Sequence, residues 1–148
     1  MLPLTKLWML KLRMLLLVAA VFAVAPVRGW SQIIVIVNPN VKSSSASKAD
    51  LREVFCGSSS ALRDGTRVVP VFQRPGPVQD EFVAIYLGKS DAAFRAGWRG
   101  LVLSGQASMP RSLDSDSAVV AYVARTPGSI GYIDSKSSHD GVKVLAVQ

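Results

Sequence analysis

The sequence predicts an α/β domain with a mixed sheet of about four strands flanked by helices. First, residues 33–37 form a continuous run of β-branched residues, which is typical of a strand buried on both faces. Second, short apolar runs of strand length recur at residues 67–73, 130–133 and 142–147. Third, the segments between these runs space their apolar residues as amphipathic helices do. Strands that alternate with helices predict a layered α/β fold.

The first strand and the first helix have clear boundaries. Asn-Pro-Asn closes the strand at residues 38–40, and a serine-rich loop follows at residues 42–46. Ser47 is expected to cap a helix over residues 48–55, because a serine hydroxyl can accept from the free amides of the first turn. Gly57 is expected to end this helix. Apolar side chains at helical spacing predict that one face of this helix is buried, namely Leu51, Val54 and Phe55.

The middle of the chain predicts a second strand and a second helix. The strand covers residues 67–73 and contains Pro70, which cannot donate to a ladder and therefore predicts an edge or bulged position. The helix is expected over residues 78–87, ending at Gly88. Its inward stripe is expected to consist of Phe82, Ile85 and Tyr86.

The last part of the chain predicts two more helices and the two terminal strands. Ser90 is expected to cap a helix over residues 91–103, and another helix is expected over residues 116–125. Thr-Pro-Gly at residues 126–128 breaks the latter before the strands at 130–133 and 142–147. The inward side chains of the two helices are expected to be Phe94, Trp98, Leu101, Val102, Val119, Val120 and Val123.

Residues 1–29 have the pattern of a secretory signal peptide, which leaves residues 30–148 as the folded domain. A positively charged start is followed by an uncharged apolar run at residues 15–25, within the length of about 7–15 residues that signal peptides have. A spanning helix needs about 20 apolar residues. We therefore expect cleavage near Trp30 and a periplasmic or secreted protein that meets the membrane only through this segment. The alternative is an uncleaved N-terminal anchor.

Removal of this segment changes the charge. The whole chain has 17 Lys and Arg residues and 10 acidic residues, but four of the basic residues, Lys6, Lys11, Arg13 and Arg28, precede residue 30. The remaining 13 basic residues give a net charge of about +3, which is ordinary for a small domain. No stripe of basic and aromatic residues remains, so we expect no nucleic-acid partner.

The sequence predicts no enzyme, no metal site and no cofactor. Cys56 is the only cysteine and follows apolar residues at the end of a predicted helix, so it is expected to be buried in the core. His139 is the only histidine and lies in a polar loop. A catalytic triad needs a base that the fold holds and orients, and a structural zinc site needs several Cys or His ligands.

Two segments are candidates for binding an anion. Each precedes a predicted helix, whose free amides and positive dipole end attract phosphate-like groups. The alternatives are a flexible loop with one capping serine and a solvated arginine in a turn. The candidate ligand-binding residues are Ser43, Ser44, Ser45, Ser47, Arg74 and Gly76.

Several of these segments occur together in one family. They are Val-Asn-Pro at 37–39, the helix ending in LREVFCG at 51–57, VPVFQR at 69–74, and PGSIGY at 127–132. In this order they resemble the second lobe of the phosphate-binding proteins of ABC importers, with patterns such as LxxIFxGK and PGAIGY. The resemblance implies a single-lobe, type II periplasmic-binding-protein-like domain. It also implies phosphate or another oxyanion as ligand and an ABC permease or another envelope protein as partner.

The chain departs from this family at the phosphate site. Arg74 matches the family arginine, but Val78, Gln79 and Asp80 stand where the family has Ser-Gly-Thr, and Ser58 stands where it has lysine. Two hydroxyls are lost and a carboxylate is gained, which costs affinity for an anion. The chain also provides one lobe, whereas the family closes two on its ligand. We therefore expect weak binding of an oxyanion. The alternative is an envelope interaction module that kept the fold and lost the ligand.

Overall fold

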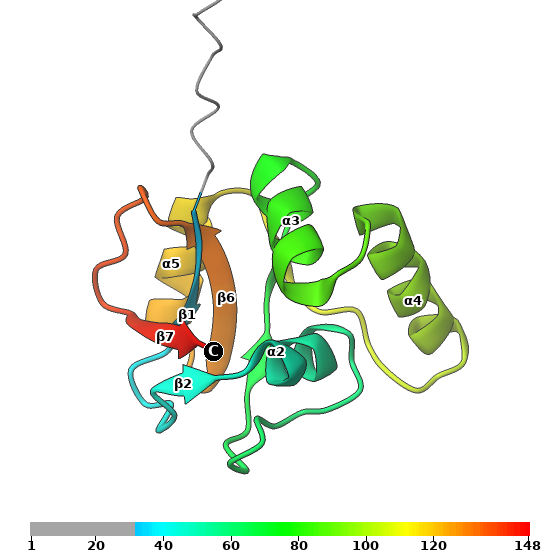
Figure 1. Ribbon diagram of the computed structural model, residues 1–148, viewed down its shortest axis with the longest axis horizontal. Coiled ribbons are helices and arrows are strands. Elements are labelled where there is room, and N and C mark those ends of the chain that lie inside the picture. The colour runs from blue at the N-terminus through cyan, green and yellow to red at the C-terminus, as the bar shows by residue number, and fades with distance from the viewer. Residues whose placement is uncertain (1–31) are drawn as a thin grey trace, which may run out of the picture. The chain divides into compact units, whose positions relative to one another are not determined.

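The computed structural model describes residues 32–148 (Figure 1). The predicted signal peptide and its cleavage site near Trp30 lie outside the described residues. The strands are β1 (Ile33–Val37), β2 (Ser45–Ala46), β3 (Val69–Pro70), β4 (Phe72–Gln73), β5 (Ser112–Leu113), β6 (Ser129–Asp134) and β7 (Lys143–Val147). The helices are α2 (Lys48–Phe55), α3 (Pro77–Phe82), the π-helical turn η2 (Val83–Leu87), α4 (Asp91–Leu103) and α5 (Asp116–Arg125).

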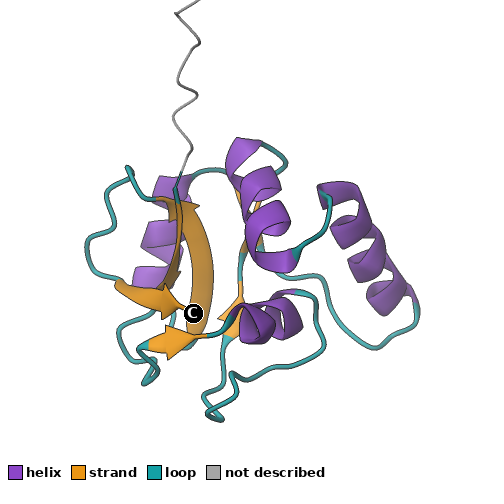
Figure 2. Cartoon of the chain, viewed as in Figure 1, coloured by secondary structure: helices purple, strands orange, loops and turns teal. Residues whose placement is uncertain are grey.

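The predicted α/β architecture is confirmed. Five strands form a mixed sheet in the order β2-β7-β1-β6-β3, and β4 pairs with β5 in a separate two-stranded sheet. Figure 2 shows helices on both faces of the larger sheet. The strand β1 is central as predicted, and it is antiparallel to both of its neighbours, β6 and β7. The edge strand β3 runs parallel to β6.

The alternation of side chains along β1 and β6 divides the core between the two faces. Val35 and Tyr132 face the larger cluster, which α2, α3, η2 and α4 cover. Ile36 and Ile133 face the smaller cluster, which α5 covers with Val119 and Val123. Gly131 allows α5 to approach this closely. A Cβ atom there would lie 2.9 Å from Val119 Cγ1.

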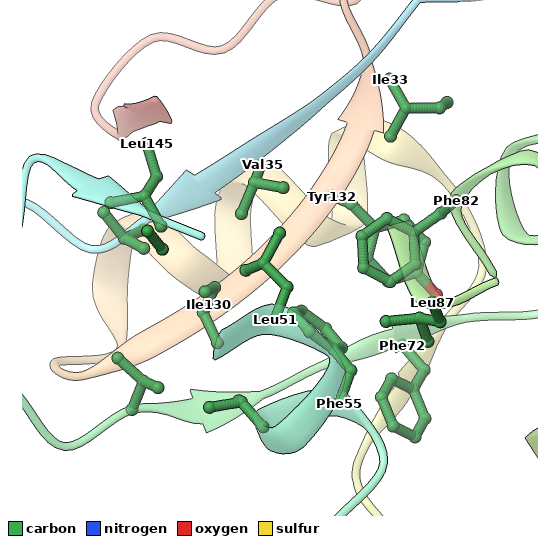
Figure 3. Packing of buried hydrophobic residues seen from close by; sticks show 14 of the residues in the cluster. Ile33, Val35, Leu51, Phe55, Phe72, Phe82, Leu87, Ile130, Tyr132 and Leu145 are labelled. Atoms are coloured by element: carbon green, nitrogen blue, oxygen red, sulfur yellow. The ribbon is translucent and has the colours of Figure 1, made fainter. Parts of the chain in front are cut away.

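Aromatic rings occupy the centre of the larger cluster (Figure 3). The rings of Phe82 and Tyr132 are stacked, with centroids 3.8 Å apart, and Phe55 meets Phe82 edge-on at 4.8 Å. Such pairs add about 0.5–1.5 kcal/mol beyond the burial of their area. Phe72 on β4 and Phe94 on α4 continue the cluster at 5.1 Å. These contacts fix α2, α3 and β4 against one another.

The first helix follows the local prediction closely. The Ser47 hydroxyl accepts from the amide of Asp50 at 3.1 Å, and the Asp50 carboxylate accepts from the amide of Ser47 at 3.0 Å. This reciprocal capping box satisfies two amides that the helix leaves free. The amide of Ser47, together with the Ser47 hydroxyl and Arg63, holds the pKa of Asp50 below its usual value. The Ser90 and Ser115 hydroxyls cap α4 and α5 by accepting from the amides of Ala93 and Ala118, without a reciprocal bond.

The segment predicted as one helix over residues 78–87 consists of two kinds of helix. Gly88 ends it in the left-handed conformation as expected. The stripe prediction is wrong at Ile85, which is 42 % exposed. The π-helical turn adds a residue to the repeat. Tyr86 and Leu87 therefore follow Phe82 inward, and Ile85 is displaced to the surface.

Three further expectations need correction. The run at 67–73 is not one strand, because Val71 ends the pairing with β6 and β4 pairs with β5 instead. The serine-rich loop contains the short strand β2, which pairs with β7. Val102 is 40 % exposed rather than buried. The edge position expected for Pro70 is confirmed, since it lies in the outermost strand β3.

Among residues 32–148, no helix combines the length and the apolar character that crossing a bilayer requires.

Candidate anion-binding site

Arg74 stands at the end of β4 with its side chain in solvent. Its amide donates to the carbonyl of Leu113 on β5 at 3.0 Å, which continues the pairing of the two-stranded sheet. Its guanidinium Nε lies 2.6 Å from Asp114 Oδ1. The two side chains are 68 % and 65 % exposed. The arginine is therefore anchored through its backbone, while its charged group is accessible to a ligand.

The residue before Arg74 connects this edge to the interior. Gln73 is buried, and its amide donates to the Tyr132 hydroxyl at 2.9 Å. Its side-chain Nε2 donates to the carbonyl of Tyr132 at 3.0 Å and to Asp116 Oδ1 at 2.6 Å. Three hydrogen bonds thus fix the backbone on which Arg74 is carried.

The Tyr132 hydroxyl extends this arrangement toward α4. It donates to Gln79 Oε1, and Gln79 Nε2 donates to Asp91 Oδ1 at 3.0 Å. Arg95 then donates to the other oxygen of Asp91 at 2.8 Å. Burial raises the pKa of Tyr132 well above its ordinary value, so the hydroxyl keeps the proton that it donates. In the described part of the chain, every buried side-chain polar atom has a partner.

Asp116 lies at the other end of this hydrogen-bond network, which runs from Asp91 through Gln79 and Tyr132 to Gln73. Its Oδ2 accepts from the amide of Asp134 at 3.1 Å and from the Ser137 hydroxyl at 2.6 Å, while its Oδ1 accepts from Gln73. Sequence reasoning missed this network because its members are far apart in the chain. The single local signal was a glutamine at the end of an apolar strand, which marks a buried amide that needs partners.

The start of α3 lies next to Arg74. Gly76 precedes the helix in an extended conformation with no side-chain cap, and Pro77 is the first helical residue. Gln79 turns into the core, whereas Asp80 is exposed. This stretch therefore offers an anion no hydroxyl, as the substitution of the family's Ser-Gly-Thr predicts.

In the other candidate segment, the hydroxyls of Ser43 and Ser47 are engaged within the protein, whereas Ser44 and Ser45 are exposed and pair through their backbone. The buried Ser43 hydroxyl lies 2.5 Å from Asp64 Oδ2 and 2.9 Å from Thr66 Oγ1. Ser45 lies in β2, and the carbonyl of Ser44 accepts from the amide of Ala146 at 3.1 Å. Ser47 is the capping residue of α2.

The structure does not bring these serines together with Arg74. Ser43 contacts Thr66, which precedes β3, and β3 pairs with the start of β6. Arg74 follows Gln73, which contacts Tyr132 near the end of β6. The two candidate segments therefore lie toward opposite ends of β6, and one small ion cannot contact both.

The remaining chemistry-bearing residues do not form a constellation. Cys56 is half-buried against the larger cluster rather than fully buried, and burial raises the pKa of its thiol. His139 Nδ1 lies 2.9 Å from the carbonyl oxygen of Ser137. Residues 32–148 contain no group of three or more His, Cys, Asp or Glu side chains placed to hold a metal ion.

The fold is similar to that of one lobe of the substrate-binding proteins of phosphate ABC transporters. The phosphate-bound structure from Clostridium perfringens described by that name is similar over 78 % of this chain, with a TM-score of 0.59 and 16 % identity. An ABC-type phosphate transport receptor from Vibrio cholerae gives 0.59 and 14 %, and PstS from Borrelia burgdorferi gives 0.57 and 16 %, each over 78 % of the chain.

The chain spans less than half the length of these proteins, with matches over 44 %, 45 % and 47 % of the three structures. This extent corresponds to a single lobe of a two-lobed binding protein. The neighbours are described as solute-binding proteins, not as enzymes. No protein-family model matches the chain, and no curated protein matches it. At these identities the likeness establishes the fold.

Proposed function

We propose that the protein is an exported, phosphate-type solute-binding domain that binds phosphate or another small oxyanion weakly at Arg74, beside Gly76. The observation that carries this proposal is the accessible guanidinium on a rigid support. Arg74 is anchored by its bond to Leu113 and by the buried Gln73, yet its side chain is 68 % exposed. A planar guanidinium matches the oxygens of a phosphate in pairs. The fold shared with phosphate-binding proteins supports this choice of ligand.

The expected affinity is low because the site has one cation and a competing anion. A hydrogen bond to a charged group contributes about 1.5–3 kcal/mol, and a Kd of 1 mM corresponds to about −4 kcal/mol. Asp114 already accepts from Arg74 at 2.6 Å, so an oxyanion must displace or share that contact. We therefore expect millimolar rather than micromolar binding of phosphate.

An NMR titration of the purified protein with phosphate, and then with sulfate, tests this proposal. The amides of Arg74 and Gly76 should shift with a millimolar Kd. Arg74→Ala should abolish the shift at Gly76. Asp114→Asn should tighten binding by up to about fivefold, because it removes an exposed ion pair worth about 0.2–1 kcal/mol.

Arg99→Ala is the matched control, since Arg99 is exposed on α4 and makes no ion pair within residues 32–148. It should leave the Kd unchanged. Binding that survives Arg74→Ala would remove Arg74 from the site.

Export is the second part of the proposal. It is supported by the signal-peptide pattern of residues 1–29. The mass of the protein recovered from the cell envelope should correspond to an N-terminus near Trp30. An intact Met1 would instead indicate an uncleaved anchor.

The alternative, an envelope interaction module without a ligand, is favoured by one observation. Gln79 is buried and Asp80 is exposed where the family places ligand hydroxyls. If the amides of Arg74 and Gly76 do not respond to millimolar phosphate or sulfate, the result favours the interaction module. Co-purification with a permease or another envelope protein then tests that alternative.

A further inference from the structure

A cavity of about 420 Å³ lies toward the end of β6 opposite Arg74. It is formed by three segments: the chain after β1, the turn before β3, and the turn between α5 and β6. Small-molecule sites have volumes of roughly 300–1,000 Å³, so the cavity can hold a ligand larger than a bare phosphate ion. The lining residues are Asn40, Val41, Lys42, Asp64, Gly65, Thr66, Arg67 and Gly128.

The side-chain oxygens of Asn40 and Asp64 in this cavity already accept hydrogen bonds within the protein. Asn40 Oδ1 accepts from the amide of Gly128 at 3.0 Å. Asp64 Oδ1 accepts from the amide of Thr66 at 2.9 Å, and its Oδ2 accepts from the Ser43 hydroxyl at 2.5 Å. These contacts, that of the Ser43 hydroxyl above all, hold the pKa of Asp64 below its usual value. A ligand that donates to these two side chains therefore competes with bonds that they already make.

Three side-chain donors of the same cavity have no partners among residues 32–148, namely those of Lys42, Arg67 and Asn40. Lys42 and Arg67 are exposed, and neither makes an ion pair within residues 32–148. The Nδ2 group of Asn40 likewise makes no hydrogen bond there. Lys143 adds a positive charge at the rim, because its ammonium donates to the carbonyl of Val41. Two lining cations and one rim cation outweigh the single carboxylate of Asp64.

We propose that this cavity is a second anion site, which takes a small organic phosphate through Lys42, Arg67 and the Asn40 amide. A phosphate monoester supplies acceptor oxygens to the unpaired donors, and its organic part uses the volume that a bare ion leaves empty. The guanidinium of Arg67 suits a phosphate because it can donate two parallel hydrogen bonds. This site is independent of Arg74.

An NMR titration of the purified protein with glucose 6-phosphate, and separately with inorganic phosphate, tests the proposal. Glucose 6-phosphate should shift the amides of Gly65, Thr66 and Gly128. Arg67→Gln and Lys42→Gln should each weaken this binding by roughly three- to tenfold, the net effect of one hydrogen bond at a solvated site. Arg74→Gln should leave these shifts unchanged, which separates this site from the one proposed above.

Matched controls are Arg99→Gln and Lys89→Gln, which remove the same charges from exposed positions outside the cavity. They should change the Kd by less than about twofold, the residual effect of screened long-range charge. The proposal is overturned if the three amides do not respond to the ester, or if the controls weaken binding as much as Arg67→Gln does. An equal response to inorganic phosphate would overturn the choice of an ester as ligand.

Discussion

The Tyr132 hydroxyl joins Gln73 to Gln79 in the buried hydrogen-bond network, and we expect its removal by Tyr132→Phe to destabilise the fold strongly. The hydroxyl accepts from the amide of Gln73 at 2.9 Å and donates to Gln79 Oε1. Tyr132 is 1 % exposed, so water cannot replace the lost oxygen. The substitution keeps the stacked ring and leaves one buried donor and one buried acceptor without partners.

The expected loss follows from these two groups. A buried polar group left unsatisfied costs about 1–3 kcal/mol, so the free energy of unfolding should fall by about 2–6 kcal/mol. That is a large fraction of the roughly 5–15 kcal/mol that stabilises a small domain. For a domain of this size, the melting temperature should fall by roughly 10 °C or more.

The three tyrosines of the chain form a graded series for the assay. Tyr86 donates one hydrogen bond to the carbonyl of Ile33 at 2.8 Å and is half-buried, so Tyr86→Phe should cost about 1 kcal/mol. The Tyr122 hydroxyl makes no hydrogen bond within residues 32–148, and the ring's contact with Arg111 survives in phenylalanine. Tyr122→Phe should therefore stay within about 0.5 kcal/mol of the parent.

Urea unfolding of the purified variants measures the series. Equal effects of Tyr132→Phe and Tyr122→Phe would refute the reasoning. If Tyr132→Phe does not fold, the double variant with Gln79→Leu still tests the argument. Gln79→Leu removes the acceptor that Tyr132→Phe leaves unsatisfied, and Asp91 keeps its contact with Arg95 when it loses the bond from Gln79. The double variant should therefore recover part of the lost stability.

Two further predictions concern pH. Burial raises the pKa of Tyr132 above the ordinary value of 10.0, so the unfolded chain loses this proton at lower pH than the folded protein does. The free energy of unfolding should therefore fall above about pH 10, by up to about 1.4 kcal/mol per pH unit. Urea midpoints between pH 9 and 11 should show this slope, and it should be smaller in Tyr132→Phe; an unchanged slope would contradict the assignment. The pKa of Asp50 is lowered from 3.8, so the stabilisation that it gives is present above about pH 4 and is lost as pH falls through the folded value. Asp50→Asn should lower the free energy of unfolding by about 1 kcal/mol at neutral pH, and its urea midpoint should depend less on pH at acidic pH than that of the parent. Asp80→Asn, at an exposed position, should have neither effect.

The elements that the sequence predicted with correct bounds are those whose signals are local. The helix over residues 48–55 is specified by its own cap at Ser47, and α4 begins after Ser90 in the same way. The central strand β1 is specified by apolar residues that must be covered on both faces. Caps and periodicity act over a few residues, so one sequence is enough to read them.

The departures arise where a distant segment competes with the local pattern. The run at 67–73 is divided because residues after Val71 leave β6 and pair with β5, about 40 residues later in the chain. The π-helical turn places Tyr86 and Leu87 inward in place of Ile85, which fits the packing against Phe82 and α2. Local propensity has no information about either contact.

For the candidate sites, too, local signals identified single residues and the tertiary structure decided which of them lie together. The sequence by itself determined the α/β class, the resemblance to phosphate-binding proteins and the presence of Arg74 after a strand. Only the tertiary structure decided that Ser43 and Arg74 lie toward opposite ends of β6, and that Gln73 is fixed by Tyr132 and Asp116. The physical reason is that hydrogen bonds between residues 43 to 59 positions apart depend on how the sheet and its helices pack.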